Sequence, residues 1–344
     1  MLSRSVSRRQ VLFGTVAGAS AAALMATLPG AVFAQDAATP VAASDTFPVT
    51  IPHVYGETVI ESQPLRVVTI GWSTQDAVIA LGIDPVAMPL NTWGGDAEGF
   101  LPWTRSALGD RPLPILLDTT EIPFEVIAGV TPDVILAPYS GITEEEYGLL
   151  SEIAPTVAYP EIAWGTSWQD VQTISATALG FSAKGAQLVA DTEALIASQT
   201  EQYPELAGKT FIYGNMSSGE AFNLYTTTDA RSLFLSAIGL EPSEYAKSLD
   251  AKADPASPYF VTVSFEEAGD LEADIVVFWF ETQEGYDAAQ AMPLFNEIPA
   301  VKRGSFVPVV GADLVMATSA FSVLSIPYML DAFIPSLAEA AGKI

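Results

Sequence analysis

The chain has 344 residues, of which 49% are hydrophobic, and its formal net charge is −27 at pH 7. This length is sufficient for two domains with sizeable cores. The sequence contains no cysteine and one histidine, His53, which we interpret as an ordinary strand residue in VTIPHVYG. Disulfides and thiolate metal sites are therefore excluded, and a catalytic triad or zinc site would depend on His53 alone. The negative charge disfavours nucleic acid and anionic lipid as partners.

The first 34 residues have the pattern of an export signal. Arg8 and Arg9 precede an apolar, alanine-rich stretch that ends in small residues at Ala34, which predicts the twin-arginine route and cleavage after Ala34. An uncleaved N-terminal anchor is the alternative. Residues 35–45, rich in Ala, Thr and Pro, predict a disordered tether.

We therefore expect a protein in the periplasm or otherwise outside the cytoplasm, soluble after signal cleavage. No later run reaches the ~18 consecutive apolar residues that a membrane span requires, so we expect no membrane insertion. No cysteine follows the signal to carry a lipid, and we do not expect a lipoprotein.

Short β-branched runs alternate with amphipathic stretches through the first half of the mature chain. In chain order, the predicted elements are a strand at 65–72, a helix at 74–83, a strand at 84–90, a helix at 123–131, a strand at 132–140, a helix at 144–154 and a strand at 156–161. This alternation is typical of parallel βα units. It predicts an N-terminal α/β lobe over residues 46–165.

A helical apolar period then continues from Trp168 for roughly thirty residues. Ser167 is a candidate N-cap, Pro204 and Gly208 follow the end, and Gly180 is a possible interruption. Strand and helix signals resume over 206–344. We therefore predict an α/β fold of two Rossmann-like lobes, connected by a single long backbone helix over 166–205, with the ligand cleft between the lobes.

One short pattern occurs once in each lobe, in PFEVIAGVTPDVIL and SFEEAGDLEADIVV. The two stretches share a Phe-Glu pair and an Asp eight residues after the Glu, at one constant offset: Phe124, Glu125 and Asp133 in the first, Phe265, Glu266 and Asp274 in the second. A single Glu in the first turn of a helix is explained by the helix dipole. The constant offset indicates that the two glutamates occupy corresponding places on the two lobes.

These motifs resemble those of the iron–siderophore substrate-binding proteins of ABC importers, a group that also includes haem and cobalamin receptors. The resemblance is carried by IESQPLRVVTIGWSTQDAVIALGIDPVAM, FEVIAGVTPDVILAPYS, LSEIAPTVAY, PLFNEIPAVKRGSFVPV and SVLSIPYMLDAFIPSL. It implies a binding protein rather than an enzyme, without a cofactor of its own, since ferric iron arrives only within the siderophore. It also implies that Glu125 and Glu266 dock onto arginines of the permease dimer. We expect a monomer.

Aromatic residues follow several of the predicted strands, where ligands of open α/β sheets bind. The candidate ligand-binding residues of this kind are Trp72, Trp93, Tyr139, Trp164, Tyr213, Phe222, Tyr225, Trp279, Phe280 and Phe321. Any one of them is equally explained as a core residue. Together they suit a bulky, partly apolar ligand.

Basic residues are scarce near the predicted cleft. Receptors for ferric catecholates in the resembled family use arginines from both lobes, but the corresponding segments here, 93–95, 259–260 and 315–316, contain none. Arg105 is the candidate ligand contact, whereas we interpret Arg66 and Arg231 as structural. The sequence therefore favours a neutral or cationic ferric complex, such as a trihydroxamate.

Two alternatives remain open. The first is haem or a corrinoid, with Tyr139 or Tyr213 as an axial ligand of haem. The second is a two-lobed enzyme that acts on a glycan through paired carboxylates, although no motif distinguishes a pair.

Overall fold

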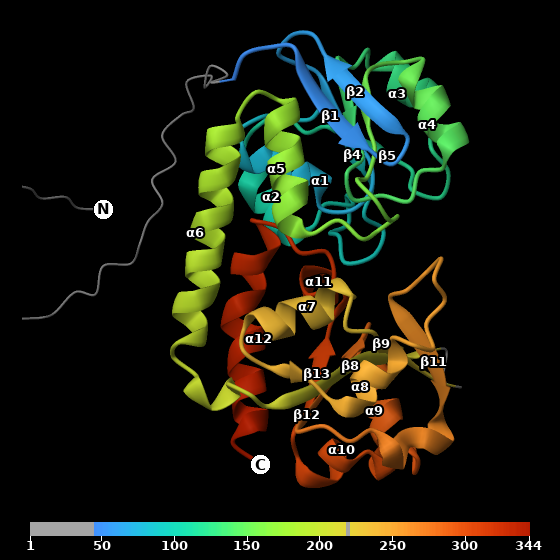
Figure 1. The fold of residues 1–344 in the computed structure, drawn as a ribbon, viewed down its shortest axis with the longest axis vertical. Helices are drawn as coiled ribbons and strands as arrows, with labels where there is room; N and C mark the ends of the chain where they lie inside the picture. The colour runs from blue at the N-terminus through green and yellow to red at the C-terminus, as the bar shows by residue number, and fades with distance from the viewer. Residues whose placement is uncertain (1–44, 218–220) are drawn as a thin grey trace, which may run out of the picture. The chain divides into compact units, whose positions relative to one another are not determined.

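The structure, a computed structural model, describes residues 45–217 and 221–344. The predicted signal, 1–34, and the predicted tether up to residue 44 lie outside the described residues. The described residues belong to one compact unit, in which two separate sheets define an N-terminal and a C-terminal lobe (Figure 1). Among the described residues, no helix combines the length and apolarity needed to span a bilayer.

The N-terminal lobe contains an antiparallel hairpin and a five-stranded parallel sheet. The hairpin strands are β1 (Val49–His53) and β2 (Gly56–Ile60). The sheet has the order β5-β4-β3-β6-β7, with β3 (Val67–Thr69), β4 (Ala87–Pro89), β5 (Ile115–Leu117), β6 (Val134–Leu136) and β7 (Thr156–Val157). Its helices are α1 (Thr74–Ala80), α2 (Pro102–Leu108), α3 (Phe124–Gly129) and α4 (Glu144–Ser151). The predicted parallel βα units are confirmed.

The single histidine belongs to this hairpin. His53 ends β1 and is buried, and its Nε2 atom lies 2.9 Å from the Thr58 hydroxyl of β2. Its interpretation as an ordinary strand residue is confirmed.

The C-terminal lobe contains a six-stranded mixed sheet. The order is β11-β9-β8-β12-β13, with β10 beside the start of β8. The strands are β8 (Thr210–Ser217), β9 (Ala221–Tyr225), β10 (Glu241–Pro242), β11 (Phe260–Ser264), β12 (Ile275–Phe280) and β13 (Phe306–Val310). The helices are α7 (Ala230–Ala237), α8 (Glu244–Leu249), α9 (Gln283–Gln290), α10 (Pro299–Arg303), α11 (Ala312–Ala317) and α12 (Ser325–Ala341). The antiparallel strands β9 and β11 were not predicted.

Residues 166–205 do not form the single predicted helix. They form α5 (Trp168–Ala178) and α6 (Ser182–Thr200), which pack against each other. Gly180 has φ +80°, a left-handed conformation that ends the first helix and redirects the chain. Ser167 caps α5 as predicted, since its hydroxyl accepts a hydrogen bond of 3.0 Å from the Asp170 amide.

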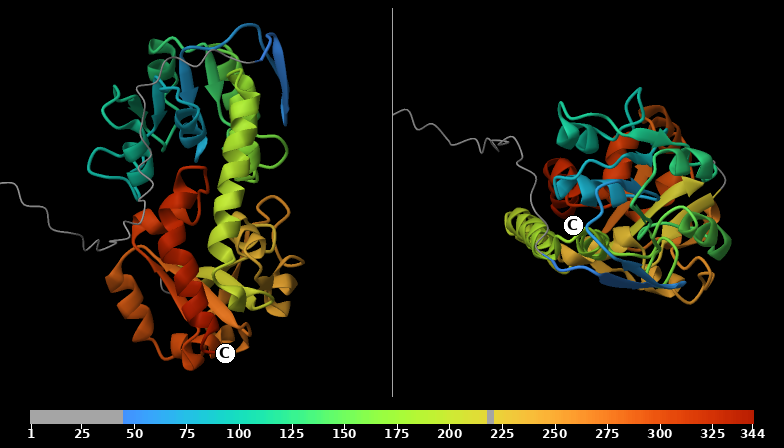
Figure 2. Two further views of the ribbon diagram at one scale, coloured as in Figure 1. Left: turned by 90° about the vertical axis from the view of Figure 1, so that its left-hand side faces the viewer. Right: turned by 90° about the horizontal axis from the view of Figure 1, so that it is seen from above.

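Helix α6 runs from the N-terminal lobe to the C-terminal lobe (Figure 1). Its first half packs against the core of the N-terminal lobe through Leu188, and its second half packs against the core of the C-terminal lobe through Ile196. Helix α12 lies beside it (Figure 2). Asp45, which we assigned to the tether, accepts a 3.0 Å hydrogen bond from the Ser182 amide at the start of α6.

The repeated sequence pattern has a structural counterpart in its aspartates. Asp133 Oδ2 accepts hydrogen bonds from the Leu65 and Arg66 amides, at 2.8 and 2.9 Å, just before β3. Asp274 Oδ2 accepts one of 2.9 Å from the Thr210 amide at the start of β8. In both lobes, therefore, the aspartate before a strand holds the start of the parallel neighbouring strand.

A buried carboxylate joins the N-terminal lobe to the segment before α12. Asp76, on α1, is 1% exposed and accepts hydrogen bonds of 2.7 Å from Trp103 Nε1, the Thr104 hydroxyl and the Ser322 hydroxyl. Burial raises the pKa of Asp76, an effect opposed by these three donors. The contact fixes the C-terminal segment against α1 and α2.

Candidate ligand-binding cleft

A cavity of about 420 Å³ is lined by residues of both lobes; we refer to it as the cleft. The N-terminal lobe contributes residues that follow β3, β6 and β7: Trp72, Tyr139, Ala163 and Trp164. The C-terminal lobe contributes β8, β9, the start of α7 and the segment before β11, with Asn215, Asn223, Tyr225, Asp229, Ala230, Arg231, Ala256, Ser257, Tyr259 and Phe260. The predicted position, beyond strand ends and between the lobes, agrees with this cavity.

The N-terminal wall of the cleft is a cluster of three rings. The ring centroid of Trp164 lies 5.6 Å from that of Trp72 and 6.0 Å from that of Tyr139. Trp72 and Trp164 are 38% and 41% exposed, which is unusual for large aromatic side chains. This wall offers a ligand broad apolar faces together with the edges of indole rings.

Glycines allow the three rings to approach. A Cβ atom at Gly71 would overlap the carbonyl oxygen of Tyr139, and one at Gly141 would overlap the Trp164 indole. Trp164 itself has φ +60°, a left-handed conformation that is costly for a bulky residue. Its amide nonetheless donates a 3.0 Å hydrogen bond to the Ser140 carbonyl, which holds the indole over Gly141.

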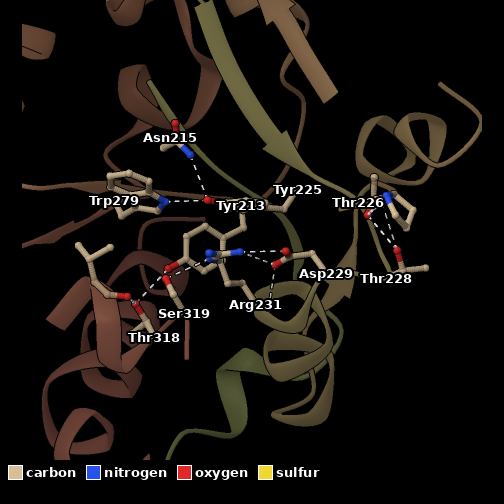
Figure 3. Close-up of polar contacts among 12 residues, drawn as sticks. Tyr213, Asn215, Tyr225, Thr226, Thr228, Asp229, Arg231, Trp279, Thr318 and Ser319 are labelled. Atoms are coloured by element: carbon tan, nitrogen blue, oxygen red, sulfur yellow. Dashed lines mark hydrogen bonds and ion pairs between the residues drawn. The ribbon is translucent and has the colours of Figure 1, made fainter. Parts of the chain in front are cut away.

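The C-terminal wall contains a buried ion pair (Figure 3). Arg231 Nη1 donates to Asp229 Oδ2 and Oδ1 at 2.8 and 3.0 Å, and Arg231 Nε donates to the Ser319 hydroxyl at 3.1 Å. The guanidinium carbon lies 4.0 Å from the centroid of the Tyr225 ring, a cation–π contact. Burial lowers the pKa of Arg231 but Asp229 and the neighbouring phenols raise it, and the net shift is upward, so Arg231 stays charged.

The hydroxyl of Tyr225 has a proton to donate. It accepts hydrogen bonds from Asn215 Nδ2 at 3.0 Å and from Trp279 Nε1 at 2.8 Å (Figure 3). An indole N–H can only donate, so the phenol oxygen must act as an acceptor toward Trp279. With both acceptor positions used, the Tyr225 hydroxyl can act toward a further group only as a donor, and this residue lines the cleft.

Four of the predicted ligand-binding residues line the cleft: Trp72, Tyr139, Trp164 and Tyr225. Trp279 lies behind Tyr225, and the Trp93 ring lies 5.8 Å from the Trp279 ring, so this pair supports the wall instead of lining it. Phe321 is buried and stacks on Phe234 with 4.7 Å between ring centroids.

Three of the predicted aromatic residues are core residues. Successive side chains of a strand point to opposite faces of the sheet. Phe222 and Phe280 point to the face covered by Phe265, in the 3₁₀-helical turn Phe265–Asp270, and by Ala300 of α10. Tyr225 and Trp279 belong to the other face. Tyr213 is 1% exposed and its hydroxyl donates to the Thr318 hydroxyl at 3.3 Å. These three residues therefore do not line the cleft, unlike the position that we expected for them.

Two arginines lie in places other than those expected from the sequence. Arg105 pairs with Asp96 at 3.0 Å and with Glu98, and its guanidinium lies over the Phe100 ring; it does not line the cleft. Arg231, which we interpreted as structural because it begins a helix, lines the cleft. Arg231 and Ser319 are far apart in the sequence, so their contact could not be inferred from the sequence alone. Arg66 is structural as predicted, since its Nη2 donates to the Val130 carbonyl at 2.6 Å.

Comparison with known proteins assigns the family. Residues 67–308 match the periplasmic binding protein family, and the chain belongs to it. The family resemblance inferred from the sequence is confirmed, and the members compared below are binding proteins, not enzymes.

Among solved structures, PiaA of Streptococcus pneumoniae TIGR4 in complex with ferrichrome is 32% identical, with a TM-score of 0.76 over 86% of this chain and 99% of PiaA. Two Bacillus subtilis proteins are also similar. YfiY, named a probable siderophore-binding lipoprotein, is 28% identical over 82% of this chain and 85% of its own length. YfmC, named an Fe(3+)-citrate-binding protein, is 25% identical over 72% of this chain and 74% of its own.

Proposed function

We propose that this protein is an extracytoplasmic substrate-binding protein that captures a ferric siderophore of neutral hydroxamate type and delivers it to an ABC importer. The observation that carries this proposal is the pair of donors formed by the Tyr225 hydroxyl and the Arg231 guanidinium, opposite the exposed rings of Trp72 and Trp164. The donors suit the oxygen atoms of a chelated metal, and the rings suit the apolar surface of the chelator.

The charge of the cleft supports a neutral ligand. Of the residues that line it in the described part of the chain, Asp229 and Arg231 are the charged ones, and they form an ion pair. A neutral ferric trihydroxamate would enter without leaving an unpaired buried charge. A trianionic catecholate would meet the Asp229 carboxylate and a single arginine that is already paired. The bound ferrichrome of the PiaA structure is a hydroxamate siderophore, which agrees with this preference.

The haem alternative is disfavoured by the state of the candidate axial ligands. Burial raises the pKa of Tyr139 to about 12, which makes the phenolate form that would bind ferric iron harder to reach. Tyr213 is buried away from the cleft, and His53 bonds to Thr58 in the hairpin. No specific observation favours a corrinoid or a glycan-acting enzyme.

Delivery to a permease would use the two repeated glutamates. Glu125 lies in the first turn of α3 and Glu266 in the 3₁₀-helical turn Phe265–Asp270; both are exposed, one on each lobe. Unlike the repeated aspartates, neither side chain accepts a hydrogen bond within residues 45–217 and 221–344. A role outside the fold is consistent with this, and two charges on a scaffold held by α6 would contact both halves of a permease dimer.

Export and the free monomeric state remain predictions. The twin-arginine signal over 1–34 and the location outside the cytoplasm depend on the sequence pattern. YfiY is a lipoprotein by name, whereas our prediction that this chain is not a lipoprotein depends on its lack of cysteine.

Tryptophan fluorescence of residues 35–344 tests the ligand class, because Trp72 and Trp164 line the cleft. We expect saturable quenching by ferrichrome and weaker or no saturable quenching by a ferric catecholate, ferric citrate, hemin and cobalamin. Tighter binding of the catecholate or of hemin would contradict the proposed ligand.

A further inference from the structure

A second, larger cavity lies beside the cleft. It has a volume of about 690 Å³ and is bordered by α6, α7 and the start of α5; we call it the α6–α7 groove. Most of its lining is apolar, with Trp168, Ile196, Ala197, Leu233, Phe234 and Ala237 among the lining residues. Leu233 of α7 is 54% exposed, whereas other residues of this helix, such as Leu235, are buried in the core. The groove therefore leaves apolar surface uncovered next to the proposed ligand site.

The groove and the cleft share a boundary. Tyr139, Trp164, Ala230 and Tyr259 line both cavities. The Tyr259 hydroxyl donates a hydrogen bond to the Ala163 carbonyl, which joins the two lobes at this boundary. A ligand held in the cleft would thus have the groove immediately beside it.

Helix α7 contributes to both cavities. Arg231, in its first turn, lines the cleft, whereas Leu233, Phe234 and Ala237, further along, line the groove. One rigid element therefore fixes the distance between the polar donors and the apolar surface. This arrangement suits a ligand with a polar metal-chelating part and an apolar extension.

The charges of the groove restrict the extension to an uncharged one. Glu193 and Glu201, both on or next to α6, are the ionisable acids that line it, and the described lining residues include no lysine or arginine. A terminal carboxylate would be repelled there, while an aliphatic chain would gain from burial against Leu233 and Phe234.

We propose that the α6–α7 groove receives an aliphatic acyl chain of a siderophore whose ferric centre lies in the cleft. The inference rests on the proposed function and specifies its substrate class as an amphiphilic siderophore. Burial of a methylene group contributes about 0.8 kcal/mol, which corresponds to about a fourfold gain in affinity for each methylene inserted.

The test uses ferric desferrioxamine B acylated on its terminal amine with acetyl, hexanoyl or decanoyl groups, below their micelle concentrations. Isothermal titration calorimetry of the protein gives the dissociation constant of each complex. We expect the hexanoyl complex to bind at least tenfold more tightly than the acetyl complex, with a further gain or a plateau for decanoyl as the groove fills.

Blocking variants locate the chain. Ala197 and Ala237 are exposed alanines on α6 and α7 that line the groove, so Ala197→Phe and Ala237→Phe should fold and fill it. We expect both variants to bind the acetyl complex as the unmodified protein does and to lose the dependence on chain length. Leu233→Asn, at an exposed position, should weaken the hexanoyl complex more than the acetyl one.

The outcomes separate the two proposals. Equal binding of the three complexes, or an unchanged length dependence in both blocking variants, would overturn the groove proposal and leave the cleft proposal in place. Failure of every ferric complex, including ferrichrome, to bind would overturn the proposed function and the groove proposal with it.

Discussion

Tyr225 and Arg231 form a single unit of the cleft, because the Arg231 guanidinium carbon lies 4.0 Å from the centroid of the Tyr225 ring. Each residue is held by one partner that lines the cleft, Asn215 or Asp229, and by one behind it, Trp279 or Ser319. Asn215 and Trp279 donate to the Tyr225 hydroxyl, and Asp229 and Ser319 bind the Arg231 guanidinium. Two donors are thereby fixed before a ligand arrives, which lowers the entropic cost of binding.

Replacement of Arg231 should weaken ligand binding. A hydrogen bond that involves a charged group contributes about 1.5–3 kcal/mol, so Arg231→Gln should raise the dissociation constant of ferrichrome by about 10- to 100-fold. Arg231→Lys should restore only part of the affinity, since lysine lacks the planar fork of donors. Titration calorimetry measures both effects.

Arg105→Gln is the control for Arg231, since Arg105 pairs with Asp96 and Glu98 outside the cleft. Its affinity for ferrichrome should stay within about twofold of the unmodified protein, because exposed ion pairs contribute little. A large loss of ferrichrome affinity in Arg105→Gln, together with an unchanged affinity in Arg231→Gln, would contradict this account. It would support Arg105 as the ligand contact, as the sequence suggested.

Removal of the Tyr225 hydroxyl should affect both binding and stability. Tyr225→Phe loses the donor to the ligand, which predicts about a 3- to 10-fold loss of affinity, and leaves the Asn215 and Trp279 donors without their acceptor. Tyr213→Phe is the control, because the Tyr213 hydroxyl bonds to Thr318 in the core. Calorimetry and urea unfolding should show that Tyr213→Phe changes stability alone; an equal affinity loss in both variants would refute the role of Tyr225.

The aromatic wall and the core aromatics should respond differently to truncation. Trp72→Leu removes an exposed ring of the cleft, and we expect a loss of ferrichrome affinity with little change in the free energy of unfolding. Phe280→Ala should lower the free energy of unfolding by about 3–5 kcal/mol and leave affinity unchanged in the folded protein, because Phe280 packs in the core. A selective affinity loss in Phe280→Ala would show that this residue contacts the ligand after all.

Asp76 predicts a pH dependence of stability. Its pKa is raised by burial, so the folded state binds the proton more readily than the unfolded state does. The contribution of Asp76 to the free energy of unfolding is full at pH values below the pKa of this carboxyl in the unfolded chain. It falls as the pH rises through the higher pKa of Asp76 in the folded protein. Asp76→Asn, which retains hydrogen-bonding atoms without the charge, should remove this fall and be at least as stable as the unmodified protein at pH 7.

Asp76→Ala is the contrasting variant, because it leaves the three donors of Trp103, Thr104 and Ser322 without an acceptor. The loss in the free energy of unfolding should be about 3 kcal/mol or more. Urea unfolding from pH 4 to pH 8 measures both variants. If Asp76→Asn were as unstable as Asp76→Ala at pH 7, the negative charge itself would be required.

Loss of both repeated glutamates should uncouple binding from uptake. Glu125→Ala/Glu266→Ala should retain ferrichrome affinity and abolish transport of iron-55 ferrichrome by cells that carry the cognate permease. The control is Glu145→Ala/Glu272→Ala, which removes one exposed glutamate from each lobe at other positions. Uptake at the normal rate in the first double variant would remove the docking role.

The sequence predicted those features of the fold that local patterns determine. Alternating strands and helices indicated the parallel units, and the Asp133 and Asp274 repeat marked equivalent places in the two sheets. The break at Gly180 was recognisable as a possibility, but only the packing of α5 on α6 decides that the chain turns there. Strand β9 was missed although it pairs with its sequence neighbour β8, whereas β11 pairs with β9 across a longer stretch of sequence that contains α7 and α8.

The site was less predictable because it depends on which face of each strand a residue occupies. Trp279 and Phe280 are adjacent in sequence, yet they belong to opposite faces of β12. Arg231 resembles any residue that follows a helix cap, and its role follows from contacts with Tyr225, Asp229 and the distant Ser319. Such contacts leave no local signal in the sequence.

The most direct measurement is a crystal structure of residues 35–344 with ferrichrome. We predict density for the ferric complex in the cleft, with hydroxamate oxygens within hydrogen-bonding distance of the Tyr225 hydroxyl and the Arg231 guanidinium and with its body against Trp72 and Trp164. A ferric complex bound elsewhere, or in the cleft without contact to either donor, would contradict the proposed site.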